Sequence, residues 1–425
     1  MKGLETIAAG LPPGRFPDSV VPVPRTVSYR FVAFLVCLVF LAPMTWAADW
    51  SFDPIFTFAA ERTDDVFASS GAVAGSGESD VALTLDARLA MTANNPRSEV
   101  SFVYQPMHEA YQDFGDLDNT SHRVHLGWNF RPTRRNEWET NATWSRQERQ
   151  RVSMDDPTLD QVALPRTRFE TYSATAQWRA GLAPRSRLVL YGAVDGNRYD
   201  AGQVDGLRLA DVTTTSAQVG YEFDANSLTV VGVSLFGSRI DEGFRGERDV
   251  LRLLGVYQRV TDERTIAITL GAAKTSVRDP GEDVPEGFQP DEPTEVVGSL
   301  TYQASLLRRG QLQMGLFRDV ASSGGTGGTT ISTGGFVSLR VPAGRWSHFS
   351  AYGHYAKRDP LSGQILAGES ETMSYRVEWN GAFSSRWYLV VAGERFDQSS
   401  DEASLDRAYT IWSLGLRWSP TAPRR

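Results

Sequence analysis

The chain has 425 residues, a formal net charge of −8 and a mean hydropathy of −0.31, and 22% of its residues are charged. This acidic balance excludes a generally basic nucleic-acid binder, and the single cysteine excludes a disulfide framework or a cysteine-ligated zinc site. The charged content also argues against a bundle of transmembrane helices. It does not argue against a membrane barrel, in which only alternate strand residues meet lipid.

The N-terminus has the order of features of an export signal. Arg25 and Arg30 form a basic region, residues 31–41 form an apolar stretch, and residues 45–47 resemble a small-x-small cleavage site. A single transmembrane helix is the competing interpretation. It is disfavoured because the apolar run is too short for a membrane and Pro43 interrupts it.

These features divide the chain into two parts. We predict an N-terminal extension and signal peptide over residues 1–47 and one outer-membrane β-barrel over residues 48–425. Removing the four basic and two acidic residues of the first part takes the net charge from −8 to −10. Cys37 would be removed as well, so the mature protein would have no cysteine.

From about residue 50 to residue 418 the sequence repeats one unit, which is about ten alternating apolar and polar residues followed by a turn. In residues 81–89, for example, every odd-numbered residue is apolar and every even-numbered one is polar or small. Successive strand residues point to opposite faces of a sheet, so each segment has one apolar face and one polar face. Lipid cannot satisfy an open sheet edge, and a closed barrel is the way such strands cross a membrane.

The connections between these segments alternate in length. The short ones contain Gly, Pro, Asn, Asp or Ser and fall at residues 94–96, 132–136, 183–185, 224–226, 261–263, 308–310, 342–344 and 384–385. The longer ones fall at about residues 64–79, 113–119, 152–166, 197–210, 239–248, 279–293, 321–329, 358–370 and 397–405. This alternation predicts an all-β fold, a transmembrane antiparallel up-and-down β-barrel of about 18 strands. Both termini would then lie in the periplasm of a Gram-negative bacterium.

The predicted outer loops are acidic, whereas the short turns carry mostly arginine. Acidic loops can bind divalent cations that bridge lipopolysaccharide phosphates, so outer-membrane lipid and lipopolysaccharide are expected partners. Loops that are simply solvated are the alternative. The barrel-assembly machinery is a further expected partner, because the last strand, residues 409–418, alternates and ends on an aromatic residue.

Strand parity also assigns the residues of the lumen. Opposite the apolar face, the predicted lumen-lining residues are Arg88, Arg123, Arg179, Arg252, Arg340, Arg376 and Arg417. Guanidinium groups offer a planar fork to carboxylate or phosphate, which predicts a path for anions. The alternative is structural: arginines and carboxylates of neighbouring strands neutralise each other, and Asp86 with Arg88 and Arg376 with Glu378 are candidates for such pairs.

The histidines do not predict a catalytic site. His122 and His125 have opposite parity, and His348 and His354 lie about 20 Å apart along one strand. No Gly-x-Ser-x-Gly elbow or His-x-x-x-His spacing occurs. We therefore predict no enzyme and no catalytic, cofactor-binding or metal-binding residues.

The first part of the predicted barrel, about residues 50–130, resembles a family of outer-membrane β-barrel porins. This family includes barrels linked to exopolysaccharide operons and to exosortase/PEP-CTERM systems. The resemblance rests on the order of short motifs at residues 52–54, 61–66, 79–81, 103–104, 117–119 and 122–124, with Tyr111 between them. The family usually has Asp-Asn in the first loop, where this chain has Asp64-Asp65. The departure leaves the expected fold intact but gives no role to that loop.

The resemblance implies a pore or assembly component for exopolysaccharide export to the cell surface, in which the lumenal arginines guide an anionic polysaccharide. The alternative is a general or anion-selective diffusion porin. A plugged structural or adhesive barrel is the third possibility. Ion conductance separates the first two from the third.

Overall fold

The computed structural model describes residues 48–65, 78–148, 167–200, 203–204, 207–279, 292–306, 309–322, 329–344, 346–361, 369–401 and 406–420. The predicted signal peptide and most of the predicted long connections lie outside these ranges. Within these ranges, no helix has both the length and the apolar character needed to cross a membrane.

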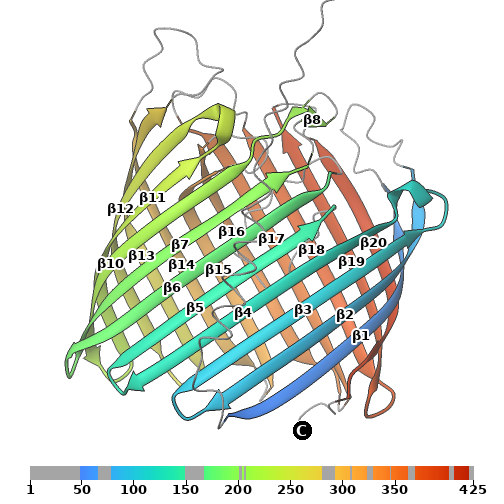
Figure 1. Cartoon of the computed structure of the whole chain (residues 1–425), viewed down its shortest axis with the longest axis horizontal. Coiled ribbons are helices and arrows are strands. Elements are labelled where there is room, and N and C mark those ends of the chain that lie inside the picture. Colours follow the sequence, from blue (N-terminus) through green and yellow to red (C-terminus); the bar gives the residue numbers. More distant parts are fainter. Residues whose placement is uncertain are drawn as a thin grey trace, which may run out of the picture. The chain divides into compact units, whose positions relative to one another are not determined.

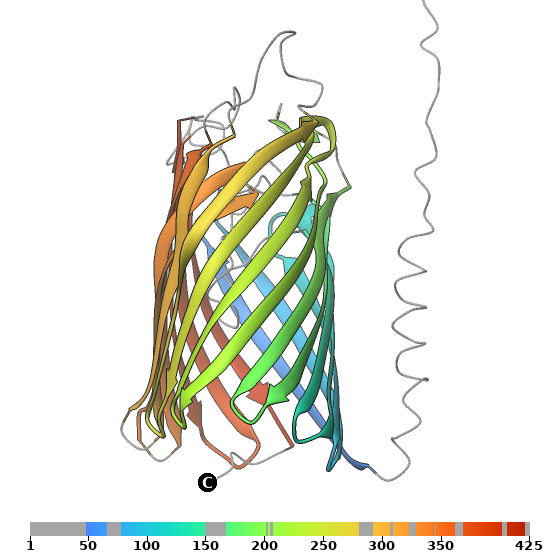
Figure 2. The ribbon, with the colours of Figure 1, turned by 90° about the vertical axis from the view of Figure 1, so that its left-hand side faces the viewer.

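Eighteen long strands form one antiparallel sheet that closes into a barrel, because the first strand pairs with the last (Figure 1; Figure 2). Each long strand also pairs with the long strands before and after it in the sequence. The strands are β1 (Asp49–Thr63), β2 (Asp80–Asn95), β3 (Ser98–Tyr111), β4 (Asn119–Thr133), β5 (Asn136–Gln147), β6 (Phe169–Ala183), β7 (Ser186–Tyr199), β10 (Val212–Asn226), β11 (Thr229–Asp241), β12 (Glu247–Val260), β13 (Arg264–Asp279), β14 (Thr294–Leu306), β15 (Gly310–Ser322), β16 (Thr329–Pro342), β17 (Ser347–Pro360), β18 (Ser370–Ala382), β19 (Trp387–Ser400) and β20 (Arg407–Trp418). The predicted antiparallel up-and-down barrel of about 18 strands is confirmed.

The remaining described elements are short and lie in connections. A two-stranded hairpin, β8 (Gln203–Val204) and β9 (Leu207–Arg208), separates β7 from β10. Two 3₁₀ turns, η3 (Gly115–Leu117) and η4 (Gly243–Arg245), precede β4 and β12.

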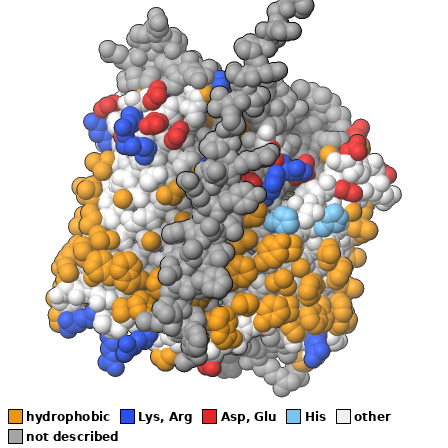
Figure 3. Space-filling view, viewed as in Figure 1, with side chains coloured by type: hydrophobic (Ala, Val, Ile, Leu, Met, Phe, Trp, Pro, Cys, Tyr) orange, Lys and Arg blue, Asp and Glu red, His pale blue; other side chains and the backbone are white. Residues whose placement is uncertain are grey.

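The two-residue alternation of the strands gives the barrel an apolar exterior. On β10, for example, the outward side chains of Val219, Tyr221 and Phe223 are 45%, 45% and 39% exposed. They lie opposite Leu235, Val233 and Val231 of β11, which are also apolar and exposed. Figure 3 shows such side chains gathered into a band across the strands, with charged side chains beyond it on either side. Within the band, β10 and β11 therefore present apolar residues outward.

The barrel has two different ends (Figure 2). The short turns gather at one end, which we call the turn end, with the start of β1 and the end of β20. The longer connections leave from the opposite end, the loop end. One predicted turn is displaced: β10 continues to Asn226 through a bulge after Asp224, so the turn falls at residues 227–228. The Asn226 side chain accepts a hydrogen bond from the Leu228 N–H at 2.9 Å and thereby starts the turn two residues later.

The connection between β3 and β4, at the loop end, is described in full. The Asp80 carboxylate accepts hydrogen bonds from the backbone N–H groups of Asp113 and Phe114, both at 3.2 Å. Phe114 and Leu117 pack against the buried Tyr111. This connection is therefore folded back onto the start of β2.

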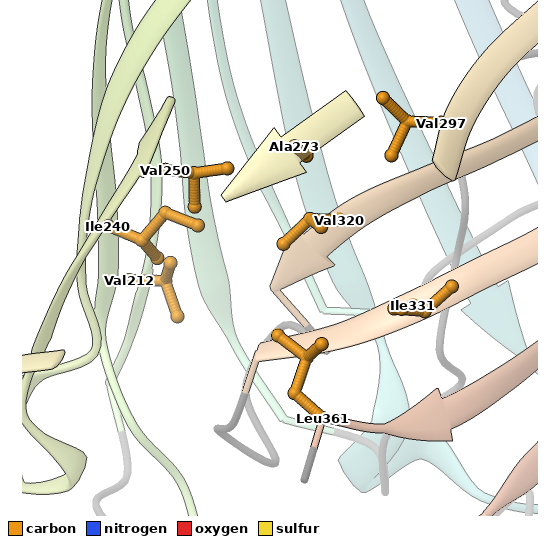
Figure 4. Packing of buried hydrophobic residues seen from close by; sticks show 8 residues of the cluster. All are labelled: Val212, Ile240, Val250, Ala273, Val297, Val320, Ile331 and Leu361. Carbon is orange, nitrogen blue, oxygen red and sulfur yellow. The ribbon is translucent and has the colours of Figure 1, made fainter. Parts of the chain in front are cut away.

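Buried apolar residues form two main clusters rather than a single core. One lies at the loop end of β10–β16 and just after β17 (Figure 4) and consists of Val212, Ile240, Val250, Ala273, Val297, Val320, Ile331 and Leu361. The other lies on β16, β17, β19 and β20 and consists of Phe336, Tyr352, Phe396, Tyr409 and Ile411. Tyr352 is the cross-strand neighbour of Arg376, so the second cluster borders the polar part of the lumen.

Candidate functional site

The lumen contains a cavity of about 590 Å³. Residues of β1–β5 and β14–β20 line this cavity, and polar side chains predominate among them. The charged residues of the lining are Glu61, Asp86, Arg123, Arg340, Arg376, Glu378 and Arg417. Four arginines thus face three carboxylates, which leaves an excess of positive charge.

The structure distributes the seven predicted arginines over two regions of the barrel. Four belong to the cavity lining, namely Arg123, Arg340, Arg376 and Arg417. Arg88 lies two residues beyond Asp86 on β2 and therefore on the same face of that strand. Arg179 on β6 and Arg252 on β12 lie on strands that do not contribute to the lining.

Two of the cavity arginines share a carboxylate. Arg376 donates hydrogen bonds to Glu378 at 3.0 Å and to Glu394 at 3.3 Å. Arg417 lies 3.8 Å from Glu378 and donates to the Asn380 side chain at 3.1 Å, while Asn380 donates to Glu378 at 2.5 Å. The side chain of Glu378 is only 13% exposed, so this network holds its two guanidinium groups in place and neutralises much of their charge.

Two other cavity arginines have no carboxylate partner among the described residues. Arg123 lies between Gln105 of β3 and Ser145 of β5, and its side chain makes no hydrogen bond or ion pair within the described ranges. Arg340 contacts only the His348 Nε2 atom there, at 3.4 Å. Because their cross-strand neighbours are amides and hydroxyls, these guanidinium groups are available to a carboxylate or phosphate in the lumen.

The expected pairing of Asp86 with Arg88 is wrong. Asp86 instead accepts hydrogen bonds from the Gln105 side chain of β3 at 3.0 and 3.1 Å, and no ion pair joins it to Arg88 in the described chain. The register places Met107 directly opposite Asp86, so Gln105 is its diagonal neighbour on β3. Diagonal neighbours are about 7 Å apart and within reach of a long side chain, so the sequence spacing of two does not by itself select Arg88 as the partner.

On the opposite part of the inner wall, two arginines are paired with carboxylates. Arg179 lies 3.4 Å from Glu137 and 3.8 Å from Glu139. Arg187 on β7 contacts Glu222 at 2.6 Å and Asp224 at 3.1 Å, so it links three acidic and basic side chains at the turn end.

Arg252 contacts a strand that is not its neighbour in the sheet. It donates to Asp319 of β15 at 2.8 Å, to the Val320 carbonyl at 2.7 Å and to the Ser238 hydroxyl at 3.3 Å, and its side chain is 9% exposed. Its ring contact with Phe236, 5.0 Å to the centroid, completes its surroundings. Arg252 therefore ties β12 to β15 and is not open to solutes.

Several lining residues were not singled out from the sequence. Gln303, Gln311 and Gln313 supply amide groups to the cavity, and His348 lies beside Arg340. The strand alternation on either side of residues 308–310 assigns these glutamines to the inner face. The search for charged residues passes over them because an amide carries no charge. No group of three or more potential metal ligands occurs among the described residues.

Comparisons with known proteins were made at the levels of family, sequence and structure. No family model matches the chain, and no curated protein matches it. Among solved structures, the chain is similar to the outer membrane protein OpdK from Pseudomonas aeruginosa, with 12% identity, a TM-score of 0.42 and coverage of 87% of this chain and 99% of that one. It is also similar to OccK2 (OpdF) from Pseudomonas aeruginosa, with 13% identity, a TM-score of 0.45 and coverage of 88% and 99%.

A third similar structure is a BenF-like porin from Pseudomonas fluorescens Pf-5, with 10% identity, a TM-score of 0.44 and coverage of 87% and 99%. Similarity at this level does not specify a substrate, so the function has to be argued from this chain's own residues.

Proposed function

We propose that the chain forms an outer-membrane diffusion pore that prefers small anions. The closed barrel supports a membrane location, because it leaves no strand edge unpaired and presents an apolar band outward. Short turns at one end and longer connections at the other are typical of outer-membrane barrels, whose short turns face the periplasm. The start of β1 and the end of β20, both at the turn end, would then be periplasmic.

The observation that carries the anion preference is the state of Arg123 and Arg340. Both line the cavity, and neither has a carboxylate partner in the described ranges. Conduction requires contacts that are favourable enough for entry and weak enough for exit. Two guanidinium groups on separate strands of the lining, each between an amide and a hydroxyl side chain, meet this requirement better than a single deep charged pocket would.

The cavity volume favours small solutes over a polymer. Sites for small molecules usually measure about 300–1,000 Å³, and the cavity of about 590 Å³ falls within this range. Export of an acidic polysaccharide would use the same guanidinium chemistry, but no contact among the described residues favours a polymer. The diffusion pore is therefore the function we propose.

Single-channel recording in planar bilayers tests this proposal. The purified barrel should conduct, and its reversal potential in a KCl gradient should show that Cl⁻ permeates more readily than K⁺. Small acidic sugars on one side should reduce the current more than neutral sugars of the same size. A silent barrel, or one that prefers K⁺, would refute the proposal, and silence would favour a plugged scaffold.

A further inference from the structure

On the outside of the barrel, basic side chains of β3, β4, β5 and β7 lie in a row at the loop-end edge of the apolar band, with the acidic Glu170 of β6 between the last two. The strand register places His122 of β4 opposite Arg146 of β5, Arg146 opposite Glu170 of β6, and Glu170 opposite Arg198 of β7. His108 of β3 lies diagonally from His122, since its own partner is Thr120. We call His108, His122, Arg146 and Arg198 the basic facet.

The basic facet has outward strand parity. Residues of β4 and β5 alternate between the two faces: Arg123 lines the lumenal cavity and Ser145 lies opposite it, so the neighbouring His122 and Arg146 belong to the outer face. His122 also borders the cavity. Figure 3 shows histidine side chains at the upper edge of the apolar band on this face, with basic and acidic side chains next to them. His108 is exposed, and the Arg146 side chain is 41% exposed.

Aromatic side chains form the next row toward the band. Tyr104 accepts or donates a hydrogen bond at 3.0 Å to the His122 Nδ1 atom, and their rings are stacked with centroids 6.2 Å apart. Tyr172 lies under the Arg198 guanidinium, 5.6 Å from its centroid. Tyrosine rings gather at the headgroup level of a membrane, where one end is apolar and the other is wet. The facet therefore lies just beyond the headgroup boundary.

The charge balance of the facet differs from that of three outward cations elsewhere at the loop end. Arg239 is paired with Asp249 at 2.9 Å, Arg395 with Asp397 at 2.8 Å, and Lys357 with Glu369.

In the facet itself, His108, His122 and Arg198 contact no carboxylate within the described part of the chain. Only Arg146 has acidic partners, namely Asp200 at 3.1 Å and Glu170 at 3.9 Å.

We propose that the basic facet binds the phosphates of a glycolipid headgroup in the outer leaflet, the leaflet that the loop end faces. The inference rests on the outer-membrane location proposed above. His122 and Arg198 are three strand spacings apart, about 14 Å, so the row is long enough for a headgroup that carries two phosphates. Arginine forks bind phosphate bidentately, and basic clusters beside a membrane surface attract anionic headgroups.

Native mass spectrometry of the full-length mature barrel tests the facet directly. The probes are diphosphorylated lipid A and the same lipid with both phosphates removed, each added to barrel purified in a neutral detergent. The wild-type barrel should retain lipid A and lose the dephosphorylated form. The triple variant H122Q/R146Q/R198Q should retain about tenfold less lipid A.

Two further variants separate binding from structure. H122Q/R198Q leaves the ion pairs of Arg146 intact and should still lower retention by about threefold. The matched control R239Q/R395Q removes two outward arginines outside the facet and should leave retention unchanged. Equal retention by wild type and both facet variants, an equal loss in the control, or no preference for the phosphorylated lipid would overturn the proposal.

Conductance measured in phosphatidylcholine bilayers tests the pore function independently of lipid A binding. A barrel that is silent but retains lipid A in a facet-dependent way would refute the pore and support the facet. A conducting barrel that does not discriminate between the two lipids would refute the facet alone.

Discussion

On β5–β10, Arg179 and Arg187 each lie within ion-pair distance of two carboxylates. On β4 and β16, Arg123 and Arg340 have none in the described ranges, although they belong to the same inner wall and have the same parity. The residue type is the same in both regions, and the cross-strand neighbours differ. Whether a lumenal arginine stiffens the wall or faces the solute is therefore decided by strand register.

The two regions should also differ in the electric field that a solute meets. A paired guanidinium and carboxylate nearly cancel at a distance, but Arg179 and Arg187 contact four carboxylates between them, so the β5–β10 wall should be net negative toward an ion in the lumen. Arg123 and Arg340 keep their full charge, and the narrow, low-dielectric surroundings of a pore focus its effect. The selectivity of the barrel should accordingly reside in a few unpaired residues.

The largest expected effect is that of R123Q/R340Q, which abolishes the difference between the two regions. A unit charge about 4 Å from an ion contributes about 1 kcal/mol even in bulk water, so losing both, about 2 kcal/mol, should lower the permeability ratio of Cl⁻ to K⁺ by about thirtyfold. Reversal potentials in a KCl gradient measure this ratio. An unchanged ratio would show that the unpaired arginines do not set the selectivity.

A smaller change in the opposite direction is expected for E378Q. This substitution removes the carboxylate that Arg376 and Arg417 share, so the cavity gains positive charge and the Cl⁻ to K⁺ ratio should rise about fivefold. E378D keeps the charge and serves as the control. If the ratio fell in E378Q, Glu378 would not be neutralising the charge of Arg376 and Arg417 in the way that the distances indicate.

The fold is predictable from the sequence because its determinants are local. Alternation with period two assigns the faces of each strand, and turn residues assign the ends, so neither requires knowledge of distant contacts. The displaced turn after β10 shows the limit of this reasoning. Asp224 and Asn226 are both turn formers, and only the hydrogen bond of Asn226 to Leu228 decides which one ends the strand.

The pairing of the candidate site is less predictable, because it depends on register between strands. Parity places Arg252 on the inner face, but nothing in the sequence indicates that Asp319, 67 residues away, lies beside it. The pair Arg376 and Glu378, two residues apart on one strand, is predictable and does form. Asp86 and Arg88 have the same spacing, but Asp86 accepts its hydrogen bonds from Gln105, a diagonal neighbour on the next strand.

Removing an arginine from the β5–β10 wall should change its charge as well. R187Q leaves Glu222 and Asp224 without their shared cation, so the Cl⁻ to K⁺ ratio should fall. We expect about a twofold change, because these carboxylates lie at the turn end, are partly exposed and are screened by salt. R187K should behave like the wild type. A fall as large as that of R123Q/R340Q would mean that both walls set the selectivity.

The smallest expected effect concerns stability and asks what the paired wall contributes if it does not select ions. Arg179 and Glu137 are 36% and 25% exposed, and ion pairs at this exposure usually contribute about 0.2–1 kcal/mol. A double-mutant cycle with R179Q and E137Q, measured by urea unfolding from lipid vesicles, should give an interaction energy of about 0.5 kcal/mol. An interaction energy above about 2 kcal/mol would be typical of a desolvated pair. The β5–β10 wall would then be a stabilising element of the barrel, and the division between a structural and a selective wall would be sharper than the exposed fractions indicate.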